Sequence, residues 1–379
     1  MNRKYKIILS LLLLTITGYI VYPFQYFLQD STYGSVSEIH VMIVKRSAHA
    51  ATLLEDGRVF LTGGILKAEG IEENNSSTEF YNPATNSFSP GPEMSTKRAG
   101  HTATLLKDGN VLITGGFNNA GFLRTAELFN VHSRKFEMVN GLLSEPRAAH
   151  TATLLKDGRV LFAGGVNGGV KSNQFLDIYD PAANSISKIN SLITSRTGHT
   201  ATLLNDGRVL IAGGSSNWRS DVLNTCELFD PATNTISQTA TLHSVRNKHA
   251  AVKLQDGRVL IIAGSNEAES IGGRYNTCEL FDPKNNTFLL LKNKLTDSRF
   301  KITNAADILP NGNIIIAGDG KYVEMFDART QKFHTIRGSV EEAWMYPTVT
   351  TLKEGKVLIT GGYNGSMKPT DKAWVYKLK

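Results

Sequence analysis

The chain has 379 residues and a formal net charge of +7, from 41 lysines and arginines against 34 aspartates and glutamates. Arg3, Lys4 and Lys6 supply three of these positive charges, and the other charges are scattered in both signs along the chain. Because no polybasic stripe is present, we expect no nucleic-acid partner. Two cysteines, Cys226 and Cys278, are too few for a disulfide framework, and both recur in the phrase NTCELFDP, which indicates small buried packing positions.

Residues 1–22 combine a basic start with an apolar, uncharged run over 7–22. As a helix this run would be about 24 Å long, close to the thickness of a bilayer core. No A-x-A-like cleavage site follows it, which favours an uncleaved signal anchor, and a cleaved signal peptide stays the alternative. We expect 23–34 to be a tether and the rest of the chain to lie outside the cytoplasm, either membrane-anchored or secreted.

One phrase then repeats along the chain. Residues 196–214 read RTGHTATLLNDGRVLIAGG, and 98–116 and 147–165 are nearly the same. Looser copies begin at Arg46, Arg246 and Arg299, and a degenerate copy spans 344–362. The starts are about fifty residues apart, which is the signature of a repeat architecture. We number these units repeats 1 to 7 in chain order.

Each repeat contains the chemistry of four strands. The stretches HTATLL and RVLIAGG are short, aliphatic and joined by Asp-Gly, which predicts a two-residue hairpin turn with positive φ at both central residues. A second phrase, such as ELFDPATNTI at 227–236, adds two strands around an Asp-Pro turn. No helical periodicity is present. Four-stranded units repeated this often predict an all-β propeller.

The R-x-x-H start, the Gly-Gly after an aliphatic strand and the FDP or YDP phrase resemble kelch repeats, especially the bacterial type with ATLLxDGRVLxxGG. The resemblance covers 46–379 and implies a seven-bladed kelch-type β-propeller. The chain ends just after the third strand of repeat 7. We therefore expect 35–44 to pair with the last blade as its missing strand, so that the propeller domain comprises 35–379.

Five histidines occupy one position of the repeat. A metal site needs three or four ligands that converge on one point, whereas these side chains are distributed around a ring. The position becomes Ile302 and Pro347 in the last two repeats. We therefore expect scaffold groups that hydrogen-bond to neighbouring backbone, and no metal or cofactor. The five are His49, His101, His150, His199 and His249.

A second pattern pairs an arginine at the start of six repeats with an acid at the start of the third strand. In repeat 7 both are lost, and Trp344 and Trp374 stand in their place. We predict a charge-assisted bond within each repeat and aromatic packing in the last. The pairs are Arg46 with Glu79, Arg98 with Glu127, Arg147 with Asp177, Arg196 with Glu227, Arg246 with Glu279, and Arg299 with Glu324.

Ligand-binding candidates lie where the copies differ. The loops after Gly-Gly and those entering each arginine share one rim of the ring, and they vary in length and content. Aromatic and arginine side chains there suit interface anchors or stacking on a sugar. The asparagines after Gly-Gly have an alternative role as turn residues, and the aromatics as packing between blades. The candidates are Phe117, Asn118, Asn167, Trp218, Arg219, Arg274, Tyr275, Tyr363 and Asn364.

These features favour a monomeric, non-catalytic recognition module that binds a protein or a glycan and contacts the membrane only through its N-terminal segment. One alternative is a sugar mutarotase or epimerase, with Glu267, Glu269 and Asp221 as candidate acids and bases. The resemblance also extends to galactose oxidase, whose copper-radical chemistry needs a Cys–Tyr crosslink and a Tyr/His copper site. Both cysteines here occupy repeat positions, and the histidines outside the repeat position share no context; these are His40, His132, His243 and His334.

Overall fold

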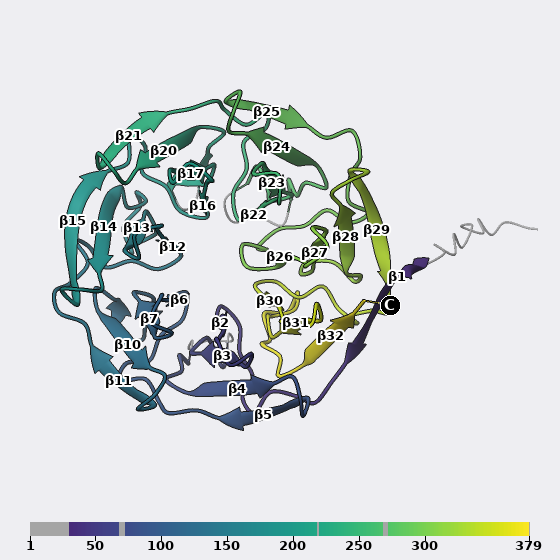
Figure 1. The fold of residues 1–379 in the computed structure, drawn as a ribbon, viewed down its shortest axis with the longest axis horizontal. Coiled ribbons are helices and arrows are strands. Elements are labelled where there is room, and N and C mark those ends of the chain that lie inside the picture. The colour runs from purple at the N-terminus through teal and green to yellow at the C-terminus, as the bar shows by residue number, and fades with distance from the viewer. Residues whose placement is uncertain (1–29, 68–72, 218–219, 268–271, 379) are drawn as a thin grey trace, which may run out of the picture.

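The computed structural model describes residues 30–67, 73–217, 220–267 and 272–378. Within these ranges the regular structure is β-strand, and the strands form a closed ring of sheets around one axis (Figure 1). No helix in the described part of the chain has the length and apolar character needed to cross a bilayer. The helix expected at 1–22 and the first part of the expected tether, 23–29, lie outside the described residues.

Five separate sheets have four antiparallel strands each, which run outward from the axis in chain order. The first contains β2 (Ala50–Leu53), β3 (Val59–Thr62), β4 (Thr78–Asn82) and β5 (Ser87–Pro90). The second contains β6 (Thr102–Leu105), β7 (Val111–Thr114), β10 (Ala126–Asn130) and β11 (Lys135–Met138). The third contains β12 (Thr151–Leu154), β13 (Val160–Ala163), β14 (Phe175–Asp180) and β15 (Ser185–Ser191). The fourth contains β16 (Thr200–Leu203), β17 (Val209–Ala212), β20 (Cys226–Asp230) and β21 (Thr235–Gln238). The fifth contains β22 (Ala250–Lys253), β23 (Val259–Ile262), β24 (Cys278–Asp282) and β25 (Thr287–Leu290).

The remaining strands of the ring form one eight-stranded sheet instead of two separate blades. Its order is β26 (Ala306–Ile308), β27 (Ile314–Ile316), β28 (Glu324–Asp327), β29 (Lys332–Arg337), β1 (Asp30–Glu38), β32 (Ala373–Lys377), β31 (Val357–Thr360) and β30 (Thr348–Thr351). The sequence predicted seven separate blades, and the count of separate four-stranded sheets is five. The two halves merge because β1 pairs on both edges, antiparallel with β32 and parallel with β29.

Strand β1 both begins and ends earlier than the 35–44 segment expected to close the ring. Ser35 lies opposite Lys377 on β32, and it also lies opposite Arg337 on β29. Beyond Glu38 the N–H groups of Ile39 and Met42 still donate to Ala373 O and Asp371 O. The N–H groups of Ile43 and Val44 then donate to the carboxylate of Glu79, which fixes the chain where it enters repeat 1.

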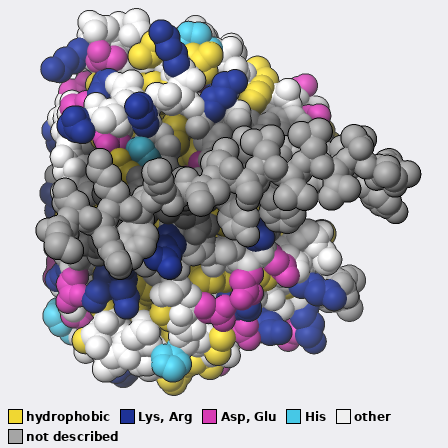
Figure 2. Space-filling model, turned by 90° about the vertical axis from the view of Figure 1, so that its right-hand side faces the viewer, with side chains coloured by type: hydrophobic (Ala, Val, Ile, Leu, Met, Phe, Trp, Pro, Cys, Tyr) yellow, Lys and Arg dark blue, Asp and Glu magenta, His cyan; other side chains and the backbone are white. Residues whose placement is uncertain are grey.

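The innermost strands contact one another in the cyclic order β2, β6, β12, β16, β22, β26, β30 and back to β2. Two short ribbons lie outside the main sheets, at the loops that follow Gly-Gly in repeats 2 and 4. They pair β8 (Phe117–Asn118) with β9 (Gly121–Phe122) and β18 (Ser215–Asn217) with β19 (Ser220–Val222). Lysines, arginines and acids are interspersed on the described side of the ring that carries β29 and β1 (Figure 2).

The hairpin at Asp-Gly differs from the predicted two-residue turn. Gly57 has a φ of 88°, whereas Asp56 is not among the residues with positive φ. The N–H of Gly57 donates to Leu54 O and the N–H of Leu54 donates to Arg58 O, so Glu55, Asp56 and Gly57 form a three-residue loop. Asp56 accepts the N–H of Arg58 with its side chain, which explains why Asp recurs here without a left-handed backbone.

The core lies between neighbouring sheets. Phe60 and Phe80 of the first sheet pack against Val111 and Phe129 of the second, and equivalent clusters fill the other junctions. The second strand of every repeat is buried along its whole length because both of its faces meet a sheet, for example β3. Each such side chain contributes roughly 1.5–3 kcal/mol by leaving water.

Candidate functional site

The six arginines that open the repeats form a buried framework layer. All are fully buried, and each pairs with the acid of its own repeat at an N–O distance between 2.5 and 2.9 Å, as the sequence pattern predicted. Arg46 also donates to Gly63 O, and Glu79 accepts two further backbone N–H groups. Burial lowers the pKa of Arg46 from its ordinary value, and Glu79 counteracts that shift. These groups therefore belong to the scaffold.

Repeat 7 replaces this ion pair with two indole rings. Trp344 and Trp374 are both buried, and their ring centroids are 6.1 Å apart. The indole N–H of Trp344 donates to Val340 O at 2.8 Å. The joint loss of arginine and acid thus leaves no buried charge behind, which is consistent with the aromatic packing expected from the sequence.

The five repeated histidines are buried and link adjacent repeats. They were expected to bond to backbone, but the structure pairs each Nε2 with a threonine hydroxyl of the preceding repeat instead, because that threonine side chain faces across the junction. The partners are Thr360 for His49, Thr62 for His101, Thr102 for His150, Thr151 for His199 and Thr200 for His249, at 2.8 to 3.2 Å. Burial lowers the pKa of all five, to about 3 for His101 and His249. They are neutral scaffold groups.

The Gly-Gly pair allows adjacent repeats to approach closely. Gly63 has a φ of 57°, and a Cβ there would lie 2.3 Å from Arg98 O and 2.8 Å from Cε1 of His101. No side chain fits at either contact. The arginine, histidine and glycine of the repeat therefore act together in the contact between neighbouring sheets.

The residue two positions after each framework arginine, or its Trp344 equivalent, forms a ring at the end of the axis. We call this the mouth position. All seven have positive φ, between 48° and 61°: Ala48, Gly100, Ala149, Gly198, Lys248, Lys301 and Tyr346. Backbone hydrogen bonds connect neighbours around this ring, for example from Gly100 N to Ala48 O and from Tyr346 N to Lys301 O, both 2.9 Å. The mouth position therefore presents one residue from every repeat around the axis.

The mouth is asymmetric. Repeats 1 to 4 carry only alanine or glycine at the mouth position, whereas repeats 5 to 7 carry Lys248, Lys301 and Tyr346. A residue with a long side chain at positive φ costs of order 1 kcal/mol or more, so three of them in succession are unusual. Such strain is most often found at binding and active sites.

The large side chains meet in what we call the mouth cluster, formed by Lys248, Phe300, Lys301, Tyr346 and Tyr363. Nζ of Lys301 donates to Oη of Tyr363 at 2.7 Å and lies 5.4 Å from the centroid of the Phe300 ring. Nζ of Lys248 lies 5.1 Å from the same ring. The Tyr346 and Tyr363 rings are 6.1 Å apart. The cluster therefore combines two ammonium groups with aromatic faces.

Asp319 contacts this cluster through the backbone of Phe300. It occupies the second glycine position of repeat 6, with a φ of 46° and 3% exposure. One carboxylate oxygen accepts the N–H of Phe300 at 2.8 Å, and the other forms an ion pair with Arg274 at 3.1 Å. Burial raises the pKa of Asp319 to about 6, and the guanidinium of Arg274 opposes that shift. Arg274, a predicted binding residue, thus borders the mouth cluster through Asp319.

Tyr363 is the predicted residue that lies inside the cluster. Tyr275 packs under the guanidinium of Arg246, 5.1 Å from its ring centroid, and so belongs to the framework. Phe117 packs against Phe122 in the β8–β9 ribbon, with ring centroids 6.0 Å apart and the rings tilted by 40°. Trp218 and Arg219 lie outside the described residues.

The three predicted asparagines have the geometry of turn residues. The side-chain oxygens of Asn118, Asn167 and Asn364 each accept a backbone N–H two residues further along the chain. This matches the alternative that the sequence left open. Among the candidate acids, Asp221 is exposed on β19 and Glu269 lies outside the described residues. The N–H of Glu267 donates to Ser265 Oγ.

The comparisons with known proteins give a fold and no family. No family model matches the chain, and no curated protein matches it. Among solved structures, the chain is similar to a fungal alcohol oxidase of the AA5 family in complex with copper, at 15% sequence identity and a TM-score of 0.70. The similarity covers 91% of this chain and 76% of that chain. The chain has a β-propeller fold.

The described residues of this propeller do not fit a copper-radical site. They contain no group of three or more histidine, cysteine, aspartate or glutamate side chains that could hold a metal ion. Cys226 and Cys278 are buried between sheets, and burial raises the pKa of each to about 12. His334 stacks on Tyr33 at 4.1 Å in the outer strands, and His243 contacts Glu279. No imidazole of the repeat position reaches the mouth, because all five are fixed on threonines.

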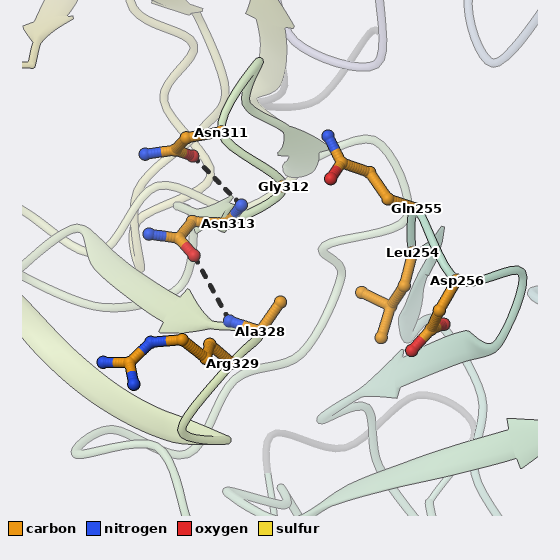
Figure 3. Close-up of a pocket in the computed structure, with 8 residues that line it drawn as sticks. All are labelled: Leu254, Gln255, Asp256, Asn311, Gly312, Asn313, Ala328 and Arg329. Carbon is orange, nitrogen blue, oxygen red and sulfur yellow. Dashed lines mark hydrogen bonds between the residues drawn. The ribbon is translucent and has the colours of Figure 1, made fainter.

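In the described residues, pockets also lie on the opposite rim, beside the Asp-Gly turns. One, of about 250 Å³, lies between the turns of repeats 5 and 6 (Figure 3). It is lined by Leu254, Gln255, Asp256, Asn311, Gly312, Asn313, Ala328 and Arg329. Asn313 is engaged within the pocket wall, since its N–H donates to Asn311 and its side-chain oxygen accepts the N–H of Ala328. A second pocket, of about 210 Å³, lies between repeats 7 and 1.

The residues predicted from the sequence did not include Lys248, Lys301, Tyr346, Phe300 and Asp319. The predicted residues lie in the loops after Gly-Gly, whereas four of these five lie inside the repeated R-x-x-H phrase and Asp319 stands at a glycine position. The signal was present, because an alignment of the seven repeats shows Ala, Gly, Ala, Gly, Lys, Lys and Tyr at the mouth position.

Proposed function

We propose that the chain is a kelch-type propeller of seven blades that acts as a recognition module and binds its ligand at the axial mouth over repeats 5 to 7. The eight-stranded sheet then counts as two blades joined by β1, which supports the number seven. We further propose that the N-terminal segment exports and tethers a monomeric propeller whose partner is a protein or a glycan.

The observation that carries this proposal is the asymmetry of the mouth. Lys248, Lys301 and Tyr346 adopt positive φ where repeats 1 to 4 carry alanine or glycine. If the position served packing alone, small residues would suffice in every repeat. Aromatic and cationic groups on a rigid scaffold are instead typical of recognition surfaces.

A direct test compares the two rims. The full chain and its Tyr346→Ala variant are applied to glycan arrays and to partner pull-downs, since alanine already occupies this position in repeats 1 and 3. The matched control is Arg329→Ala, which alters the exposed pocket of the opposite rim. We expect Tyr346→Ala to lose the ligand and Arg329→Ala to keep it. The opposite pattern would place the binding site on the Asp-Gly rim.

A copper-dependent alcohol oxidase is the second candidate, favoured by the similarity in fold to the AA5 enzyme and by the Tyr346–Tyr363 pair at the mouth. The side chains available for a metal in the described residues do not support it. Copper titration of the purified chain, followed by peroxide measurement with alcohols and sugars, decides between the two functions. Stoichiometric copper binding with turnover would replace the recognition proposal.

A further inference from the structure

We propose that the outer wall of repeats 5 and 6 docks on the surface of an anionic lipid bilayer. We call this surface the basic wall; it comprises residues 284–296 and 328–340, which include β25 and β29 with the turns and connections at their ends. The contact rests on the tethering proposed above and uses a different surface from the mouth. It adds to the N-terminal segment, which was the one membrane contact expected from the sequence.

The outer strands of repeats 5 and 6 follow each other along the wall of the ring (Figure 1). The side chain of Asn293, after β25, donates to Gln331 O beside β29 at 2.9 Å, and the hydroxyl oxygens of Thr296 and Thr335 are 3.3 Å apart. Strand β29 also pairs with β1. Residues far apart in the sequence therefore form one surface, beside the strand with which the described chain begins.

Charged residues of the basic wall all have one sign. Each of its two segments contains three lysines or arginines and no acid. The equivalent segments of repeats 1 and 4, 84–96 and 232–244, contain no lysine or arginine. The charge is therefore a property of repeats 5 and 6 and not of the repeat unit, and it was not visible as a stripe in the sequence because the fold brings the two segments together.

Four exposed residues supply most of this charge. Lys284 and Arg329 share their turns with Asp282 and Asp327, so their charge is partly balanced there. The other four are exposed, and none of them forms an ion pair with another described residue: Lys292, Lys294, Lys332 and Arg337. Clustered basic side chains of this kind are attracted to the negative surface of an anionic membrane.

The nearest acids do not cancel this charge. Asp327 lies opposite Lys332 in the ladder, but it is buried and accepts backbone N–H groups of its own turn. Glu38 and Glu341, toward repeat 7, both pair with Lys372. Asp297, at the end of the connection from β25, is partly exposed. The wall thus keeps a net positive charge.

Two leucines on β25 add an apolar contact. Leu289 and Leu290 are 57% and 41% exposed. The position of Leu289 is polar in the other repeats that have an outer strand, where it holds Ser89, Glu137, Ser187, Ser237 and His334. Leucines beside lysines suit the headgroup region of a bilayer, since the apolar side chains enter it while the ammonium groups face phosphate.

The start of the described chain favours a bilayer over another polyanion. The apolar, uncharged run ends at residue 22, and β1 begins at Asp30. Eight residues span at most about 28 Å when fully extended. If the run lies in a membrane, the wall beside β1 stays close to that membrane. A weak surface contact then suffices, because the tether holds the wall at a high effective concentration.

The position of the wall can be measured on the full chain in lipid vesicles. Cys226 and Cys278 are buried, so a thiol-reactive fluorophore labels an introduced cysteine selectively. Thr287→Cys places the label on β25, and Lys135→Cys places it at the equivalent position of β11, across the ring (Figure 1). The chain is incorporated into phosphatidylcholine vesicles with and without phosphatidylglycerol, and quenching by a spin-labelled lipid headgroup is recorded.

We expect the label on β25 to be quenched several-fold more strongly when phosphatidylglycerol is present, and the label on β11 to be quenched little in either lipid. High salt should reduce the quenching on β25, because it screens the attraction between the wall and the headgroups.

Charge and leucine variants test the chemistry of the contact. Lys292→Gln with Lys294→Gln should lower the ratio of docked to undocked protein about tenfold or more, since each basic residue near an anionic surface contributes about fivefold. The matched control, Lys135→Gln with Lys188→Gln, removes two charges from the outer strands of repeats 2 and 3 and should leave the quenching unchanged. Leu289→Ser restores the serine of repeats 1, 3 and 4 and should also weaken docking.

Equal quenching at both label positions, equal quenching with and without phosphatidylglycerol, or undiminished docking of the Lys292 and Lys294 variant would overturn this inference. Release of the wall from the bilayer by an equimolar oligoglutamate peptide would overturn it in favour of an acidic protein partner. A chain that does not enter the vesicles would refute the tether together with this contact. Recognition at the mouth is tested separately by Tyr346→Ala.

Discussion

The framework layer and the mouth position lie two residues apart in the same phrase, yet they behave in opposite ways. Arg46 and its equivalents form the same buried ion pair in six repeats, whereas the mouth position changes from alanine and glycine to lysine and tyrosine around the ring. Repetition therefore marks contacts between sheets, and the break in repetition at the mouth position is where we propose that binding occurs.

Low pH should have the largest effect on stability, because it acts on the five buried histidines together. The buried histidines have lowered pKa values, about 3 for His101 and His249, so the unfolded chain binds more protons between pH 6.5 and 3. Stability should therefore be full above pH 6.5 and should fall steeply as the pH approaches 3. Asp319, whose pKa is raised to about 6, should offset a small part of this loss as the pH falls from 6 toward its unfolded value. Thermal unfolding across this range checks the trend, and a flat profile would show that the imidazoles are accessible.

Loss of one framework acid should have the second-largest effect on stability. Glu227→Gln leaves Arg196 buried without its charged partner, and we expect a loss of roughly 3–5 kcal/mol in the free energy of unfolding. Denaturant titration measures it. The control is Asp206→Asn, which removes the exposed partner of Arg208 and should cost less than about 1 kcal/mol. Similar losses in both variants would show that the buried ion pair stabilises the fold no more than the exposed one does.

A methyl group at the closest approach between repeats should have a smaller effect. The Cβ of Gly164→Ala would lie 2.3 Å from Arg196 O and 2.7 Å from Cε1 of His199, at a φ of 61°. We expect a loss of roughly 2 kcal/mol, because backbone and imidazole must both move. Gly365→Ala, where a Cβ meets nothing within 4 Å, is the matched control and should be nearly neutral in the same denaturant titration.

Removal of a rim asparagine should have the smallest effect. Asn118 accepts the N–H of Ala120 and donates to Lys97 O on an exposed loop. Asn118→Ala should cost about 0.5–1 kcal/mol and leave ligand binding intact if the residue serves the turn. Calorimetric unfolding and the binding assay are run on the same sample. A large loss of binding with unchanged stability would show instead that Asn118 contacts the ligand.

The structural features that the sequence predicted are those that recur from repeat to repeat. The four-strand unit, the arginine–acid pairing and the scaffold role of the histidines follow from residues that recur at fixed spacing. The turn type did not follow, because Asp56 uses its side chain to bond Arg58 where a left-handed backbone was expected. The parallel pairing of β1 with β29 has no repeat signal, since β1 precedes the first repeat. The Asp319–Arg274 pair was equally hidden, because it joins a variable loop of repeat 5 to a position that holds glycine in the other six repeats.

Strand β1 joins the last two repeats of the ring at its outer edge, between β29 and β32 (Figure 1). Lys301 belongs to the repeat on one side of it, and Tyr346 and Tyr363 belong to the repeat on the other. Loss of Asp30–Glu38 would remove both pairings of β1 at once and would leave these two repeats in contact through their inner strands, β26 and β30. A segment that precedes the first repeat therefore joins the outer strands of the last two repeats.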